Sequence, residues 1–109
     1  MDQGSSSTKG ALIGDEGRIL NRIEIPVSSR GSGLRVEQDP EEIGSSVERV
    51  LSRLEEESPI DALGLTCQRS TCLLWDRETA EPLTPALSWR DRREAERVDA
   101  LADHAAVVA

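Results

Sequence analysis

The sequence predicts an α/β fold in which a small mixed sheet, including a β-hairpin, packs with two helices. Three features of the 109 residues support this fold: two short apolar segments joined by a turn, a long amphipathic helical stretch, and two further apolar runs separated by a polar loop. Aromatic residues make up only 2% of the chain, so the core must be built from aliphatic side chains. That composition favours a mixed α/β layer over an aromatic-rich β-sandwich.

A β-hairpin is predicted near the N-terminus. Residues 8–14 and 18–27 are short apolar segments, and apolar and polar positions alternate over residues 23–27. The Gly-containing segment 15–17 joins them, which is typical of a hairpin turn. The glycines of residues 28–38 indicate a loop.

A long helix is predicted to begin after Asp39. The side chain of Asp39 can accept hydrogen bonds from the free N–H groups of the first turn, and Pro40 fits that turn. Pro59 cannot continue a helix, so the helix ends before it. One apolar stripe with helical spacing lies between these signals: Ile43, Val47, Val50, Leu51 and Leu54.

The second half of the chain contains shorter elements. The apolar runs 60–67 and 72–76 are predicted strands, and residues 86–89 are a further short strand. Residues 77–85 contain two prolines and indicate a turn or loop. A second helix is predicted from Asp91 onward, and Asp91 could cap it. Its apolar positions recur at helical spacing: Ala95, Val98, Leu101, Ala102 and Ala105.

Composition and charge exclude several classes of function. The net charge is −8, and an acidic surface repels a phosphate backbone, so nucleic-acid binding is disfavoured. No stretch approaches the roughly 20 apolar residues that span a bilayer, and the N-terminus lacks the pattern of a secretory signal. We therefore expect no membrane partner and a cytoplasmic location.

The cysteines and the single histidine do not form a metal motif. Cys67, Cys72 and His104 are too few for a zinc site and are not spaced like one. Buried, reduced thiols are expected rather than a disulfide. Catalysis by a Cys–His or Ser–His pair is equally unsupported.

The first motif with chemical meaning spans residues 2–9. Gly4 lets the backbone approach a phosphate closely, and Ser5 and Ser6 offer N–H and hydroxyl donors to its oxygens. Asp2 is a hard oxygen ligand suited to Mg²⁺, and Lys9 can neutralise developing phosphoryl charge. Taken alone, a Ser-rich N-terminus is also typical of a disordered tail.

A second motif, Gln68-Arg69-Ser70-Thr71, stands where one predicted strand ends and the next begins. Hydrogen-bonding side chains in such a loop can bind a polyhydroxy substrate. An exposed polar turn without a ligand is the alternative.

The third motif is Trp89-Arg90-Asp91-Arg92-Arg93, at the start of the last predicted helix. Trp89 could pack under a sugar ring or fill the core. Arg92 and Arg93 could simply be solvated residues of the helix surface.

The order and spacing of these segments resemble the start of the FGGY carbohydrate kinases, the family of glycerol kinase and the pentulose kinases. The resemblance covers nearly the whole chain. It is carried by Asp-Gln-Gly-Ser-Ser at 2–6, Glu-Gln-Asp-Pro-Glu at 37–41, and the segments 63–71, 74–79, 82–83 and 87–93.

The resemblance implies a fold and a reaction. FGGY kinases have two actin-like, ribonuclease-H-like domains with ATP bound in the cleft between them. Residues 1–109 would then be the N-terminal part of the first domain. The implied reaction transfers the γ-phosphoryl group of ATP to a hydroxyl of a sugar or polyol, and positioning and charge stabilisation do most of the catalysis.

The resemblance also implies roles for individual residues. The expected metal ligand, for Mg²⁺, is Asp2. The residues expected to face the phosphates of ATP are Gly4, Ser5, Ser6 and Lys9. The residues expected at the sugar or polyol pocket are Gln68, Arg69, Ser70, Trp89 and Asp91.

The chain departs from the family pattern in two residues and in length. Glycerol kinases carry Glu where this chain has Ser70, which disfavours a glycerol-type clamp and favours a sugar. Lys9 replaces an Arg of many relatives, so a point charge stands in for a bidentate fork.

Family members run to several hundred residues and begin with an apolar strand before the Asp-Gln-Gly turn. We therefore expect a chain truncated at both ends, without the catalytic base or the ATP-side domain, and inactive alone. Any homo-oligomer would belong to the full-length enzyme. Two other interpretations stay open: a non-catalytic remnant or partner-binding fragment of such a kinase, and a small stand-alone domain with a Ser-rich tail.

Overall fold

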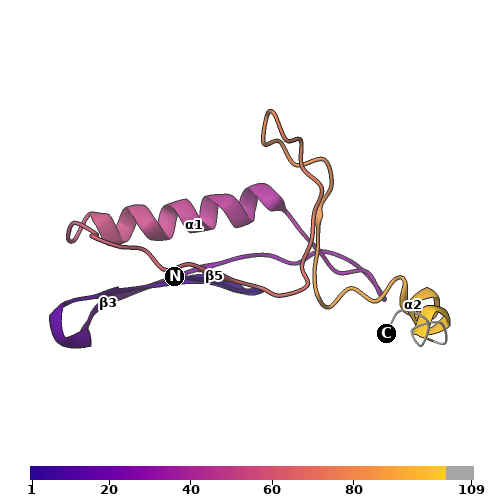
Figure 1. Ribbon diagram of the computed structural model, residues 1–109, viewed down its shortest axis with the longest axis horizontal. Helices are drawn as coiled ribbons and strands as arrows, with labels where there is room; N and C mark the ends of the chain where they lie inside the picture. Colours follow the sequence, from indigo (N-terminus) through magenta and orange to yellow (C-terminus); the bar gives the residue numbers. More distant parts are fainter. Residues whose placement is uncertain (103–109) are drawn as a thin grey trace.

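The computed structural model describes residues 1–102. The larger of its two sheets is mixed and has four strands (Figure 1). The strands lie in the order β3-β2-β1-β5, with these bounds: β1 (Asp2–Gln3), β2 (Ser7–Ile13), β3 (Ile19–Pro26) and β5 (Thr66–Cys67). β1 pairs antiparallel with β2 and parallel with β5. β2 and β3 are joined by the short 3₁₀ turn η1 (Asp15–Gly17). The predicted α/β class and the hairpin are confirmed.

Helix α1 (Pro40–Glu55) covers one face of this sheet, as Figure 1 shows. The side chain of Asp39 accepts a hydrogen bond from a first-turn N–H at 3.0 Å, which confirms the predicted N-cap. Val50 and Leu54 of the predicted apolar stripe are almost fully buried and form the core cluster with Ile25 of β3. The stripe therefore faces the sheet, as its spacing predicts.

A glycine allows α1 to approach the sheet closely. A Cβ atom at Gly10 of β2 would come within 2.4 Å of Val50 Cγ1 and 2.8 Å of Leu54 Cδ1. Both distances are far inside van der Waals contact, so a side chain at position 10 requires the helix or its side chains to shift. On the same contact the buried hydroxyls of Thr8 and Ser46 share a hydrogen bond at 2.5 Å. The apolar pattern of the sequence gives no sign of this buried polar pair.

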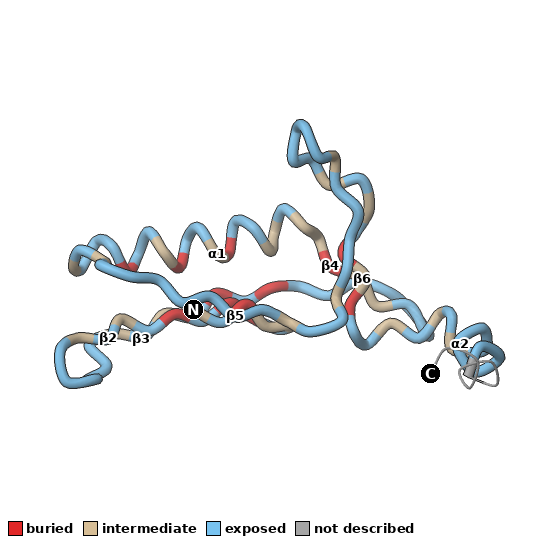
Figure 2. Tube along the Cα trace, in the orientation of Figure 1, coloured by how far each residue is buried: buried red, intermediate tan, exposed pale blue. Residues whose placement is uncertain are grey.

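A second, two-stranded sheet lies near the N-terminal end of α1. β4 (Glu37–Gln38) pairs antiparallel with β6 (Ala86–Leu87), which confirms the first half of the short strand predicted at residues 86–89. Buried residues gather where these strands meet and again between α1 and the large sheet (Figure 2). Helix α2 (Ala95–Ala102) lies at the opposite end of the molecule from the β2–β3 turn (Figure 1).

Two of the predicted strands are shorter than the sequence indicates. Of residues 60–67 only the last two pair, because their parallel partner β1 offers just two residues. Residues 72–76 make isolated bridges instead of a strand. The facing segment 82–87 contains two prolines, which have no N–H to donate to a ladder.

The expectation of buried cysteines is wrong. Cys67 and Cys72 are free, and both are exposed. Cys67 lies in β5, an edge strand of the large sheet, and Cys72 makes only an isolated bridge with Leu87. Neither position has a second layer to cover it.

Helix α2 begins four residues later than expected. Asp91 precedes it and accepts a hydrogen bond from the N–H of Arg93 at 3.1 Å, so Asp91 is not its cap. Ala105, which was expected to continue this helix, and His104 lie outside the described residues.

The apolar core is small for the length of the chain. The radius of gyration is 17.8 Å, against about 13 Å for a compact domain of 100 residues. The buried apolar residues of the described part are few: Ile25, Val27, Val50, Leu54 and Ala86. Stability therefore depends on a handful of contacts between α1 and the hairpin. Neither helix of residues 1–102 is long and apolar enough to cross a membrane.

Candidate functional site

One row of polar side chains crosses the large sheet. The strand register places Asp2 between Thr66 and Lys9, and it places Lys9 beside Glu24. The Thr66 hydroxyl donates to Asp2 Oδ1 at 3.0 Å, and Lys9 Nζ lies 3.8 Å from Glu24 Oε1. Because neighbouring side chains alternate along a strand, this row faces away from α1, where it lines an open hollow of about 810 Å³. A carboxylate and an ammonium group thus lie side by side in reach of solvent.

A second hollow, of about 440 Å³, lies where β1 and β5 end. It is lined by Gly4, Ser5, Gln68, Arg69, Ser70 and Trp89. The turn after β1 and the turn after β5 reach the same edge of the sheet because these two strands are parallel neighbours. The volume is typical of small-molecule sites. Gly4 and Ser5, predicted for the phosphate end, therefore meet residues predicted for the sugar end around one hollow, whereas Asp2 and Lys9 line the other hollow.

The turn after β5 holds Ser70 in an unusual backbone conformation. Its φ is +63°, in the left-handed region that residues other than glycine seldom occupy. The N–H of Gln68 donates to the carbonyl of Gln3 at 3.1 Å, which ties the start of the turn to β1. Strain of this kind persists only where surrounding contacts hold it, and it concentrates at ligand sites.

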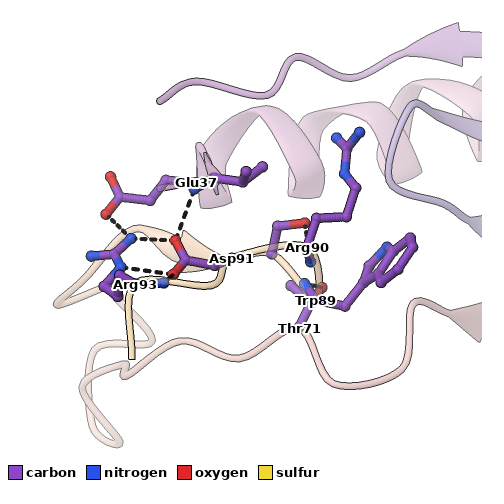
Figure 3. A network of polar contacts seen from close by, with 8 residues as sticks. Glu37, Thr71, Trp89, Arg90, Asp91 and Arg93 are labelled. Carbon is purple, nitrogen blue, oxygen red and sulfur yellow. Dashed lines mark hydrogen bonds and ion pairs between the residues drawn. The ribbon is translucent and has the colours of Figure 1, made fainter. Parts of the chain in front are cut away.

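Trp89 is an exposed residue of this hollow. Its residue exposure is 56%, so the interpretation that it fills the core is wrong. The backbone N–H of Trp89 donates to Thr71 Oγ1 at 3.1 Å, as Figure 3 shows, and Thr71 donates in turn to Gln68 Oε1 at 2.9 Å. An indole is thus held beside the 68–71 turn with its surface free for a ligand.

Asp91 does not line the hollow, and its carboxylate belongs to a charged network (Figure 3). It accepts hydrogen bonds from Arg93 Nε at 2.9 Å, from Arg93 Nη2 at 2.6 Å and from the N–H of Val36 at 2.8 Å. Arg93 Nη2 also lies 2.6 Å from Glu37 Oε1. The Arg93 side chain is only 22% exposed, so it is an internal contact and not a solvated helix residue. The network joins β4 to the segment before α2.

This network makes the stability of the chain depend on pH. The hydrogen bond from the Arg93 side chain, helped by the N–H of Val36, holds the pKa of the Asp91 carboxyl well below its usual 3.8. A carboxyl whose pKa is lower in the folded chain stabilises the fold fully above its unfolded pKa. That contribution is lost as the pH falls from about 4 toward the folded pKa.

We therefore expect Asp91→Asn to lower the unfolding midpoint at pH 7. We also expect it to make the loss of stability between about pH 5 and pH 2 less steep, because carboxyl groups ordinarily titrate in that pH range. Denaturant unfolding of the 109-residue chain at several pH values measures both effects. The exposed Asp61→Asn is the control and should leave the pH profile parallel to that of the unchanged chain. An Asp91→Asn profile as steep as that of the unchanged chain would contradict the role of the network.

The fit of Asp2 to a magnesium ion rests on its single exposed carboxylate. Among residues 1–102, no group of three or more His, Cys, Asp or Glu side chains converges on one point. Mg²⁺ commonly takes one or two carboxylates and completes its shell with waters and substrate phosphates. Asp2 is exposed and lies next to Lys9 in the row, so it can serve as the single carboxylate of such a magnesium site. It does not fit a metal site that needs several protein ligands.

The structure gives roles that the motifs do not predict to three residues of the motifs. Thr71 fixes the backbone of Trp89, and Arg93 joins Asp91 to Glu37. Thr71 and Trp89 stand 18 positions apart, and Glu37 and Arg93 stand 56 positions apart. A single sequence contains no signal that links residues at such distances.

Comparisons with known proteins show the family of the chain. Residues 1–107 match the N-terminal domain of the FGGY family of carbohydrate kinases. The glycerol kinase of Coxiella burnetii (strain Dugway 5J108-111) is 36% identical over 115 residues, which cover 100% of this chain and 23% of that protein. The chain belongs to the FGGY family of carbohydrate kinases, and it spans less than a quarter of the length of that relative.

Solved structures of the family share the fold. A glycerol kinase of Plasmodium falciparum with ADP superposes with a TM-score of 0.83 at 28% identity, covering 94% of this chain and 22% of that chain. A gluconate kinase of Lactobacillus acidophilus gives a TM-score of 0.87 at 21% identity over 95% of this chain and 22% of the other, which is evidence for the fold alone. The predicted partial actin-like domain is therefore confirmed.

Proposed function

We propose that this chain is the N-terminal part of an ATP-dependent carbohydrate kinase that transfers the γ-phosphoryl group of ATP to a hydroxyl of a sugar or polyol. The observation that carries the proposal is the hollow at the ends of β1 and β5, where the Gly4–Ser5 turn meets Arg69, Ser70 and Trp89. Phosphoryl transfer requires the two reactants to be held side by side. A hollow lined by both a phosphate-binding turn and sugar-binding side chains could hold them in that way.

The nucleotide end would be served by the turn after β1 and by the row on the sheet. Backbone and hydroxyl groups of Gly4, Ser5 and Ser6 would donate to phosphate oxygens, and the ammonium of Lys9 would offset their charge. Asp2 would hold Mg²⁺, which neutralises charge on the phosphates when it is bound. The Plasmodium falciparum relative, whose structure contains ADP, supports a nucleotide ligand.

The sugar or polyol end would be served by Arg69, Ser70 and Trp89. The guanidinium of Arg69 offers several fixed donors to hydroxyl oxygens, and the exposed indole of Trp89 offers an apolar surface. Ser70 is short and uncharged, which leaves room for a substrate larger than glycerol. Asp91 would act indirectly, since its carboxylate is occupied by Arg93. Free, exposed thiols at Cys67 and Cys72 favour a reducing compartment such as the cytoplasm.

A chimera tests the reaction. Residues 1–107 would replace the matching segment of the Coxiella burnetii glycerol kinase, and the product would be assayed with Mg-ATP and glycerol, xylulose or gluconate. We expect turnover of at least one of these polyols or sugars. A folded chimera that consumes ATP with none of them would refute the proposal.

Arg69→Ala in this chimera is expected to raise the KM for the sugar or polyol by about tenfold to a hundredfold, since a hydrogen bond to a charged group is worth about 1.5–3 kcal/mol. The KM for ATP should change little. Arg92→Ala is the matched control, because Arg92 is exposed and does not line the hollow. Equal losses for both substrates would indicate a folding defect, and no loss would indicate an exposed turn without a ligand.

A further inference from the structure

All three glutamines of the chain lie in one cluster beside the hollow. Gln3 ends β1, Gln38 ends β4 and Gln68 follows β5, so three separate elements contribute. Gln68 Nε2 donates to Gln38 Oε1 at 2.9 Å and to Gln3 Oε1 at 3.2 Å. Gln38 is 1% exposed and Gln3 is 6% exposed. Burying an amide group lowers the stability of the fold unless its donors and acceptors form hydrogen bonds. We therefore expect the cluster to have a specific structural role.

The cluster holds the carbonyl groups of the turn between β1 and β2. Gln38 Nε2 donates to the carbonyl of Ser5 at 2.9 Å, and Gln3 Nε2 donates to the carbonyl of Gly4 at 2.8 Å. Gln68 Nε2 makes a longer contact of 3.5 Å with the same Gly4 oxygen. Both carbonyls of the turn therefore point into the protein.

This orientation fixes where the next amide hydrogens point. The peptide bonds of residues 1–102 are all trans, and in a trans peptide the C=O and the following N–H point in opposite directions. With the carbonyls of Gly4 and Ser5 bound to the cluster, the N–H groups of Ser5 and Ser6 point away from it. Two outward N–H groups in adjacent residues of a turn can both donate hydrogen bonds to one anionic oxygen.

The same cluster also reaches the other side of the hollow. Gln68 Oε1 accepts the hydroxyl hydrogen of Thr71 at 2.9 Å, and Thr71 Oγ1 accepts the backbone N–H of Trp89 at 3.1 Å. A continuous chain of hydrogen bonds thus runs from the Gly4–Ser5 turn through Gln68 and Thr71 to Trp89. The amide of Gln68 is used at both ends by the protein itself.

We propose that Gln68, together with Gln3 and Gln38, is a positioning residue that sets the geometry of both ends of the hollow at once, and does not itself bind the sugar. This inference rests on the proposed function for its catalytic consequence, but the structural coupling it describes can be tested without any activity. Gln68 fixes the outward N–H groups of the β1–β2 turn on one side and the backbone of Trp89 on the other.

The structural test uses the ¹⁵N-labelled 109-residue chain. The sequence contains three glutamines and one asparagine, Asn21, so only four side-chain amide groups appear in the spectrum. We expect the amide hydrogens of the three glutamines to exchange with solvent at least about fivefold more slowly than the same groups in the chain unfolded by urea, the factor that one net hydrogen bond gives. Gln68→Met keeps the length of the side chain and removes its hydrogen bonds, and it should shift the backbone N–H signals of Ser5, Ser6 and Trp89. Glutamine amides that exchange as fast in the folded, unchanged chain as in the unfolded chain would overturn the proposal without recourse to any variant.

The kinetic test uses the chimera and compares Gln68→Met with Arg69→Ala. A positioning role at both ends predicts a fall of about tenfold to a hundredfold in kcat, the cost of a small misplacement, with losses in kcat/KM for ATP as well as for the sugar or polyol. Gln38→Met should act on the same step, so the double variant should cost less than the sum of the single variants. A loss confined to the KM for the sugar would make Gln68 a substrate ligand and refute the positioning role. An inactive chimera whose labelled chain shows the protected amides would refute the proposed function and leave the cluster intact.

Discussion

Replacing Asp2 or Lys9 with alanine in the chimera is expected to lower kcat by about a hundredfold or more, the usual cost of removing one preorganised group that stabilises transition-state charge. The two side chains are direct neighbours in the β1–β2 register and face the same open hollow. Steady-state kinetics with saturating sugar and varied Mg-ATP measures the effect. The Asp2→Ala variant should in addition need more Mg²⁺ to reach half its maximal rate.

Arg22→Ala is the matched control for this prediction. Arg22 lines the same hollow and carries the same charge as Lys9, but its partner across the ladder is Ala11 and not a site residue. If the location of the charge matters, Arg22→Ala should leave kcat close to that of the unchanged chimera. Unchanged turnover in both the Asp2 and the Lys9 variants would remove the nucleotide role of the row.

Gly10→Val is expected to lower the free energy of unfolding of the 109-residue chain by about 1–3 kcal/mol, the typical cost of forcing extra volume into a packed core. Even a Cβ atom at position 10 would lie 2.4 Å from Val50 Cγ1, and Val50 is fully buried. The free energy of unfolding of a whole domain is only about 5–15 kcal/mol. Because the core of this chain contains so few residues, the loss would be a large part of its stability. Thermal or denaturant unfolding followed by circular dichroism measures it.

Two further substitutions decide whether packing is the cause. Gly44 lies on the exposed side of α1, and no atom lies within 4 Å of a Cβ added there. Gly44→Ala should therefore raise the free energy of unfolding by about 0.4–1 kcal/mol. Val50→Ala added to Gly10→Val should recover part of the loss by making room. If Gly10→Val and Gly44→Ala behave alike, the close approach of α1 to β2 is not what limits position 10.

Local patterns in the sequence determine the hairpin, helix α1 and the family. Asp39, Pro40 and the apolar stripe around Val50 are short-range signals, and each reports on the residues next to it in the chain. The site motifs, including Arg69 and Ser70, are likewise contiguous stretches, so their resemblance to a kinase family is visible without a structure. Helix capping and apolar periodicity act within one or two turns, which is why such signals survive in a single sequence.

The tertiary structure alone decides which of these residues meet. The parallel pairing of β1 with β5 brings the Gly4–Ser5 turn and the 68–71 turn to one hollow, and the assembly of Gln3, Gln38 and Gln68 depends on the same pairing. The surroundings of Asp91 and the exposure of Cys67 do not follow from the sequence for the same reason: both depend on partners or covering layers far away in the chain. Burial and hydrogen bonding are set by whatever lies across the fold, and a pattern read along one chain contains no information about that neighbour.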